Sequence, residues 1–360
     1  MKLHIFNPEH DMALAANDPH FTAPHAGRDM RADLGFLPAL WADDGDAVLV
    51  DNAEAAREKA RHLKGHAADV RFVERTDVKQ LDSLTGIDPW GWDSTLRCQL
   101  ASAGVDSSLL PDEEVLRQTR EVSNRGWAAI HLLSALQMKA TTGKTTIVKD
   151  VEEVGKMIAD QHDLCLKAPW SCSGRGVRFV DKETWHERGR QWAANVIRRQ
   201  GSLTVEPVYD KVKDFGMEFE MRDGQCCYRG LSLFKTINGA YAGNIIATER
   251  AKREMMSRYV DLSLLDNLAK KAEAIMQPVL HGFYKGPFGI DMMLVRQEDS
   301  QMLLVHPCVE LNLRRTMGHV ALQLSPTEND PQALMRVDYS NGYHFRIIST
   351  RENVVDKDVF

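Results

Sequence analysis

Three oxygen-bearing side chains in the C-terminal part of the chain have the types and spacing of a magnesium site. Glu310 and Asn312 are two residues apart, so on a β-strand they project from the same face. Asp291 lies on an apolar segment, 289–295, that is expected to pair with theirs across a polar turn. Carboxylate and amide oxygens suit Mg²⁺ that bridges nucleotide phosphates. The solvated face of an edge strand carries similar residues, and spacing alone does not decide between the two interpretations.

Two cationic side chains accompany these oxygen donors. Arg314 continues the face of Glu310 and Asn312, where its guanidinium can hold a phosphate or a substrate carboxylate. Lys167 ends another apolar segment and is followed by a loop, 171–176, of sequence Ser-Cys-Ser-Gly-Arg-Gly. Glycines let backbone N–H groups approach phosphate oxygens, and the lysine adds a compact positive charge. An exposed surface hairpin is the alternative interpretation of this loop.

Two common phosphate motifs are not satisfied. Residues 143–145 (Gly-Lys-Thr) resemble the end of a P-loop, but the position that requires the first glycine is Met138, and a strand is expected to follow instead of a helix. Residues 174–176 (Gly-Arg-Gly) resemble part of a dinucleotide-binding fingerprint, yet its third glycine position is Phe179. A nucleotide would therefore need a different type of site.

The elements that must position these residues fall into two kinds. Up to about residue 115, apolar segments at 3–6, 47–50 and 70–73 alternate with helical patterns at 29–41, 53–63 and 94–103, which predicts a parallel α/β sheet. After an expected helix at 121–138, the pattern becomes α+β. Strands are expected at 145–148, 164–168, 177–180, 203–208, 216–222, 225–234, 289–295 and 302–313, with helices at 151–161, 185–199 and 262–280.

The loop after the first expected strand is a candidate substrate contact. Ligands of open α/β sheets bind beyond the carboxyl ends of the strands. Asn7, Glu9 and His10 follow the first strand directly and have polar side chains suited to such contacts. A hydrogen-bonded structural cluster is the alternative. His20 and His25 lie nearby, but the histidines lack a recognisable metal-binding spacing.

The order of these features resembles the ATP-grasp superfamily, which includes D-alanine–D-alanine ligase, glutathione synthetase, biotin carboxylase and the carbamoyl phosphate synthetases. The resemblance covers roughly residues 120–320 and is strongest at 166–169 with the following glycine loop and at 309–314. It implies a Rossmann-like pre-ATP-grasp α/β domain followed by a two-lobed ATP-grasp domain. The expected divisions are 1–118 for the first domain, 119–202 and 203–345 for the two lobes, and 346–360 for a tail.

The resemblance also implies a role for each matching residue. Arg125 stands where the family has its first phosphate-binding lysine, and Asp214 where it usually has a ribose-binding glutamate. Lys167 and Arg314 become the catalytic cations. The implied nucleotide contacts are Arg125, Lys167, Ser173, Gly174, Gly176, Glu206, Val208 and Asp214, and the implied metal ligands are Asp291, Glu310 and Asn312.

The implied reaction is ligation driven by ATP and Mg²⁺, with Mn²⁺ as an alternative metal. A substrate carboxylate would take the γ-phosphoryl group of ATP, and an amine or other nucleophile would then displace phosphate from the acyl phosphate. Two rival interpretations keep the nucleotide site: a kinase for a small molecule, and a nucleotide-binding regulator without turnover. The partners are small-molecule substrates, and the resemblance also allows a homodimer.

Composition narrows the class of protein. The 360 residues carry a formal net charge of −6, which disfavours a dedicated nucleic-acid binder. No apolar run approaches the length of a membrane span, and the N-terminal apolar stretch is too short for a signal peptide. The six cysteines form no CxxC pair, which favours reduced thiols. We therefore expect a cytoplasmic protein that does not bind membranes.

Overall fold

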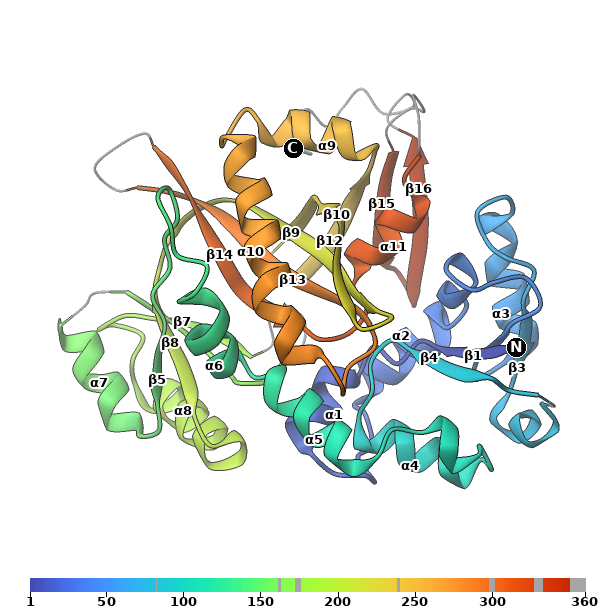
Figure 1. Ribbon diagram of the computed structural model, residues 1–360. Helices are drawn as coiled ribbons and strands as arrows, with labels where there is room; N and C mark the ends of the chain where they lie inside the picture. Colours follow the sequence, from blue (N-terminus) through green and yellow to red (C-terminus); the bar gives the residue numbers. More distant parts are fainter. Residues whose placement is uncertain are drawn as a thin grey trace.

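The computed structural model describes residues 1–81, 83–160, 163–171, 176–237, 240–297, 302–326 and 333–349. Within these ranges the strands form four sheets of four strands each. Figure 1 shows the N-terminal sheet on one side of the molecule, a small lobe coloured green on the other side, and two further sheets between them. Among the described residues, no helix combines the length and apolar character that crossing a membrane requires.

The N-terminal sheet is parallel, as predicted, with the strand order β3-β2-β1-β4. Its central strands carry fully buried residues such as Leu3 and Val48. The chain moves outward from β1 to β3 and then returns to the other side of β1 as β4. The loops after β1 and β4 therefore meet at a topological switch point, where ligands of open α/β sheets bind. The elements are β1 (Lys2–Ile5), α1 (His10–Ala16), α2 (His25–Leu34), β2 (Ala47–Leu49), α3 (Ala53–Ala60), β3 (Arg71–Val73), β4 (Gly86–Pro89) and α4 (Ser94–Ser102), with short 3-10 helices at Leu37–Leu40, Arg61–Leu63, Arg75–Gln80 and Ser107–Leu109.

Two of the expected helices are interrupted. The helix expected at 29–41 ends at Leu34, and Pro38, which has no backbone N–H, lies in a 3-10 turn instead. The helix expected at 121–138 is divided into α5 (Glu113–Val122) and α6 (Arg125–Ala128), which continues as a π-helix, Ala129–Leu133. The division arises because the Asn124 side chain accepts a hydrogen bond from the backbone N–H of Gly126 and caps a new helix.

The green lobe is a small antiparallel sheet of order β5-β8-β6-β7. Val154 and Ile158 of α7 and Ala193 of α8 pack against its buried face. The expected boundary at residue 202 separates β8 from this lobe, whereas β8 pairs with both β5 and β6 inside it. The elements are β5 (Thr146–Val148), α7 (Val151–Asp160), β6 (Leu164–Lys167), β7 (Val177–Val180), α8 (Glu187–Gln200) and β8 (Leu203–Pro207).

The central sheet is antiparallel, with order β10-β9-β13-β14, and contains much of the apolar core. Phe219 and Phe288 on neighbouring strands are fully buried and stack with ring centroids 5.2 Å apart. Helix α10 packs across β10 and β9. The elements are β9 (Asp210–Arg222), β10 (Gln225–Ser232), α9 (Glu249–Met256), α10 (Leu262–Leu280), β13 (Gly286–Arg296) and β14 (Leu303–Asn312).

A fourth sheet, of order β11-β12-β15-β16, joins the C-terminal part of the chain to the N-terminal domain. Phe6 and Trp90 share one apolar cluster with Val320 of α11, Met335 of β15 and Phe345 of β16. Figure 1 shows β15 and β16 beside the N-terminal domain. Strand β16 crosses the expected start of the tail at residue 346. The elements are β11 (Phe234–Ile237), β12 (Ala240–Ile246), α11 (Met317–Leu324), β15 (Ala333–Tyr339) and β16 (Tyr343–Ser349).

Candidate active site

The predicted metal ligands lie together on the central sheet. Asp291 of β13 is directly opposite Glu310 of β14, and Asn312 lies two residues further along the same face. The Asn312 side-chain amide donates to Oδ2 of Asp291 at 3.0 Å. Pro307 lies where the register between the two strands shifts, which fits the missing backbone donor of proline. The hairpin therefore places two carboxylates and one amide on a single face.

The electrostatics of this face fit a divalent cation. Burial raises the pKa of Asp291 to about 8, and the neighbouring carboxylates of Glu310 and Glu218 push the pKa in the same direction. Carboxylates crowded in this way are relieved by a bound cation. Among the described residues, no group of three or more His, Cys, Asp or Glu side chains could hold a metal ion. A cation on Asp291, Glu310 and Asn312 would therefore take its other ligands from nucleotide phosphates and water.

Lys167 and Glu206 form a buried ion pair in the small lobe. Cys165 is opposite Glu206 in the β6–β8 ladder. Lys167, two residues after Cys165, is therefore the diagonal neighbour of Glu206 on the same face of the sheet. The ammonium donates to Oε2 of Glu206 at 2.6 Å, and both residues are buried. The other oxygen of Glu206 accepts a hydrogen bond from the hydroxyl of Thr145 at 3.1 Å. The lysine is thus held in place at the end of β6.

Arg125 connects the small lobe to the metal-ligand face. Its guanidinium donates at 2.6 Å each to the backbone oxygen of Ala168, to the hydroxyl of Ser171 and to Oε1 of Glu310. Burial alone would lower the pKa of Arg125, but the carboxylates of Glu310, Asp11 and Glu206 together outweigh it and the pKa is raised. The cation is therefore retained between the two lobes, where the sequence predicted a phosphate contact.

Arg314 is held by Asp11, an acid that the sequence analysis did not select. Nε of Arg314 lies 2.9 Å from Oδ1 of Asp11, and its NH2 group lies 2.8 Å from Oδ2. Burial opposes ionisation of Asp11, but Arg314 lowers its pKa below the ordinary value. The arginine also donates to Oδ1 of Asn312 at 2.8 Å. Asp11 lies in the first turn of α1, directly after the loop that follows β1, and that position was the available signal for it.

The other polar residues of this loop bond to their own domain. The Asn7 amide donates to the backbone oxygen of Gly91 at 2.9 Å, and Nδ1 of His10 lies 3.1 Å from Oδ2 of Asp93. Glu9 forms an ion pair with Arg31. Asn7, Glu9 and His10 are all buried, so in this conformation they stabilise the loops after β1 and β4. Their role as substrate contacts stays a prediction.

The remaining predicted nucleotide contacts are placed differently. Val208 is 40% exposed, and its backbone N–H donates to the oxygen of Asp163 at 3.2 Å. Asp214 on β9 accepts hydrogen bonds from Lys211 and Thr236, each at 2.7 Å. Their roles in binding adenine and ribose stay predictions.

The predicted phosphate loop is described only at its ends. Ser173 and Gly174 lie outside the described residues. The backbone oxygen of Gly176 accepts a hydrogen bond from the N–H of Ala168 at 2.8 Å. A Cβ atom at Gly176 would lie 2.3 Å from the Ser171 side chain, so this close approach requires glycine. The turn therefore begins and ends beside Lys167.

His306 is a further polar residue that the sequence analysis did not single out. It is fully buried on β14, with Nε2 4.0 Å from Oε2 of Glu206. Burial lowers its pKa to about 4, so the ring is neutral at physiological pH. Neither ring nitrogen has a hydrogen-bond partner among the described residues. Its position in an otherwise apolar strand, 303–309, was the only signal in the sequence.

The comparisons with known proteins were made by sequence and by structure. No protein-family model matches the chain, and no curated protein matches it in sequence. N5-carboxyaminoimidazole synthetase from Staphylococcus aureus, complexed with ADP, is similar in structure with a TM-score of 0.50 and 13% identity, over 94% of this chain and 82% of that one. The biotin carboxylase domain of 2-oxoglutarate carboxylase from Hydrogenobacter thermophilus, a dimer with MgADP, ADP and bicarbonate, has a TM-score of 0.54 and 14% identity, over 93% of this chain and 74% of that one. The chain has the ATP-grasp fold.

This result confirms the predicted fold class, an α/β domain followed by a two-lobed ATP-grasp unit. In the ATP-grasp fold of this chain, the β5-β8-β6-β7 sheet is the smaller lobe and the β10-β9-β13-β14 sheet is the larger one. Lys167 lies on the first sheet, Glu310 lies on the second, and Arg125 reaches both.

Proposed function

We propose that this chain is an ATP-dependent ligase that joins a carboxylate to an amine or another nucleophile through an acyl phosphate. The observation that carries the proposal is the 2.6 Å hydrogen bond from the Arg125 guanidinium to Oε1 of Glu310, beside Asp291 and Asn312. It puts a buried cation from the small-lobe side against a face of oxygen donors on the large lobe. The similar S. aureus protein binds ADP, and the similar H. thermophilus domain binds MgADP and bicarbonate, which supports a nucleotide and a small carboxylate as ligands.

The cations would neutralise charge on the transferred phosphoryl group. Phosphoryl transfer requires mainly positioning and charge stabilisation from the protein. Lys167 and Arg125 donate hydrogen bonds to carboxylates in the structure, and phosphate oxygens offer them equivalent acceptors. Glu206 and Glu310 hold these cations at fixed positions, so little reorganisation is needed when phosphates arrive.

Asp291, Glu310 and Asn312 would hold Mg²⁺, and Mn²⁺ would use the same donors. The metal, when bound, supplies charge stabilisation to the phosphate oxygens. Arg314 lies beside Asn312 and donates to its side-chain oxygen, which keeps that oxygen oriented. We propose that a substrate carboxylate is positioned by Arg314, with Asp11 as the competing anion in the unliganded protein.

The first test is MgADP binding by isothermal titration calorimetry. We expect binding by the wild type, and weaker binding by Lys167→Met, because that variant lacks the ammonium proposed to contact the phosphates. The matched control is Lys149→Met, which removes an exposed lysine. Absence of binding by the wild type at millimolar MgADP, or equal binding by all three proteins, would refute the nucleotide site.

The second test separates ligation from other uses of ATP. The protein is incubated with MgATP, hydroxylamine and a panel of carboxylates that includes bicarbonate. An acyl phosphate reacts with hydroxylamine to give a hydroxamate, whereas a phosphorylated alcohol does not. Hydroxamate that depends on ATP and Lys167 supports the ligase. Production of ADP together with a phosphorylated alcohol would show that the protein is a kinase and not a ligase.

The oligomeric state, measured by light scattering in the same buffer, tests the proposed homodimer.

A further inference from the structure

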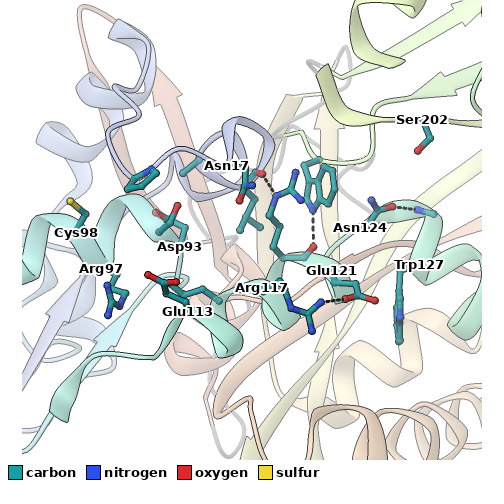
Figure 2. Close-up of a pocket in the computed structure, with 18 of the residues that line it drawn as sticks. Asn17, Asp93, Arg97, Cys98, Glu113, Arg117, Glu121, Asn124, Trp127 and Ser202 are labelled. Carbon is teal, nitrogen blue, oxygen red and sulfur yellow. Dashed lines mark hydrogen bonds and ion pairs between the residues drawn. The ribbon is translucent and has the colours of Figure 1, made fainter. Parts of the chain in front are cut away.

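A cavity of about 890 Å³ lies beside helices α5 and α6. Its walls come from α1 and α4 of the N-terminal domain, from α5, and from Ile147, Trp170 and Ser202 of the small lobe. In Figure 2, Arg97 and Cys98 of α4 lie toward one end and Trp127 and Ser202 toward the other. The cavity is large enough for a small organic molecule.

Arg120 provides this cavity with a positive charge. Its guanidinium carbon lies 3.8 Å from the centroid of the Trp170 ring, and its Nε donates to the backbone oxygen of Leu14 at 2.7 Å. The Trp170 indole in turn donates to the backbone oxygen of Arg120 at 2.9 Å, which fixes the stack. Among the described residues, no carboxylate forms an ion pair with Arg120. Burial lowers its pKa, and no anion in the described part of the chain opposes this effect.

The acids in the walls of the cavity do not neutralise Arg120. Asp93 is buried and accepts hydrogen bonds from the Asn7 side chain and the backbone N–H of Leu96, besides its contact with His10. Glu121 pairs with Arg117 at 2.9 Å, and Figure 2 shows this pair. Glu113 is exposed in the first turn of α5. Within the described part of the chain, the Arg120 guanidinium bonds through Nε to the backbone oxygen of Leu14, which leaves its two terminal nitrogens for an incoming anion.

Much of the remaining wall is apolar. Leu14, Leu116, Trp127, Ile130 and Ile147 line it, and Ile130 is 56% exposed. A planar guanidinium stacked on an indole matches the two oxygens of a carboxylate, and the apolar side chains would cover a hydrocarbon or aromatic body. We propose that this cavity binds an organic anion whose carboxylate pairs with Arg120 and whose apolar body packs on these side chains.

The site is separate from the nucleotide cleft. Asn124 and Gly126 line the cavity, whereas the Arg125 side chain between them extends the other way to Glu310. An anion on Arg120 and a nucleotide near Glu310 would lie on opposite sides of this segment. The proposal therefore does not depend on the ligase reaction, and both ligands should bind at the same time.

The test uses 4-phenylbutyrate as the probe, measured by calorimetry on the full chain. The neutral 4-phenylbutanol and the cationic 4-phenylbutylamine keep the apolar body, and inorganic phosphate keeps only a negative charge. We expect 4-phenylbutyrate to bind at least about tenfold more tightly than each of the other three compounds. A charge-assisted hydrogen bond in a partly buried site increases the affinity by about this factor. Equal affinity for the alcohol, tighter binding of phosphate, or no binding of 4-phenylbutyrate would overturn the proposal without any substitution.

Variants then place the anion. Arg120→Met keeps an unbranched side chain without the guanidinium and should weaken 4-phenylbutyrate binding about tenfold or more. Arg117→Met is the matched control, because Arg117 lines the same cavity but is already paired with Glu114 and Glu121. Unchanged affinity in Arg120→Met, or an equal loss in both variants, would overturn the assignment. Saturating MgADP should leave the affinity of the wild type for 4-phenylbutyrate unchanged, and competition would show that the anion binds in the nucleotide cleft instead.

Discussion

Replacing Asp291 with asparagine tests the electrostatics of the proposed metal face. Burial, with the carboxylates of Glu310 and Glu218, raises the pKa of Asp291 to about 8. Without a bound cation, the folded protein therefore holds a proton on Asp291 at pH 7, whereas the unfolded chain does not. Asparagine keeps the shape and the acceptor for the Asn312 amide but cannot ionise.

The magnitude follows from the difference between the two pKa values. The interval from 3.8 to about 8 sets a ceiling of about 6 kcal/mol, since each pKa unit is about 1.4 kcal/mol. Asp291 is only partly buried by its neighbours, and water and relaxation reduce the effect, so we expect about 2 to 3 kcal/mol. Between about pH 4 and pH 8 the folded state binds one more proton than the unfolded state, so stability falls as pH rises through this window. Asp291→Asn should match the wild type near pH 4 and exceed its stability above pH 8.

The assay is urea unfolding of both proteins across this pH range with a chelator present. Asp43→Asn is the control, because the Asp43 side chain is 84% exposed and its removal should leave the pH profile unchanged. The decisive quantity is the difference in unfolding free energy between Asp291→Asn and the wild type at each pH. A difference that stays constant from acid to alkaline pH would refute the raised pKa.

The proton on Asp291 should also make the affinity for MgADP depend on pH. A divalent cation binds the ionised carboxylate, so MgADP affinity should rise by about one decade per pH unit between about pH 6 and pH 8 and then level off. The Asp291→Asn variant should lose that part of the slope which comes from Asp291, although it binds more weakly at every pH. Calorimetry in two buffers of different ionisation enthalpy would measure the released proton directly, and an equal release from both proteins would contradict the assignment.

Three further substitutions test the contacts around the site. Glu310→Gln leaves the buried guanidinium of Arg125 without its carboxylate and should cost about 2 to 3 kcal/mol of stability, since Glu310 itself is partly exposed; urea unfolding that matches the wild type would contradict this. Asp11→Asn removes half of a bidentate ion pair and should cost about 1 to 3 kcal/mol, and an unchanged midpoint would show that the pair adds nothing to domain packing. Phe219→Ala opens a cavity in the central core and should cost about 3 to 5 kcal/mol, whereas a loss below 1 kcal/mol would mean that the core collapses around the vacant space.

Local patterns predicted much of the fold. The alternation of strands and helices before residue 115 predicted the parallel sheet, and the apolar segments that end at Lys167 and Asn312 are β6 and β14. Strand β4 was not predicted, because the segment 86–89 is short and of mixed polarity, and the fourth sheet was largely missed. No strand was predicted within residues 235–246, although β11 and β12 pair there and β12 also pairs with β15, about 90 residues away. A strand of mixed polarity gains its stability from such partners, which no local window contains.

The sequence by itself determined which oxygen-bearing side chains share one strand face. The spacing of Glu310 and Asn312 places both side chains on one strand face, because side-chain direction in a strand repeats every two residues. The tertiary structure alone decided which charges meet: Arg125 with Glu310 across 185 residues, and Arg314 with Asp11 across 303. Neither contact leaves a periodic signal, because each depends on how separately folded elements pack. Such pairs depend on the apolar core that joins the domains, because closing loops of this length costs entropy that one ion pair does not offset.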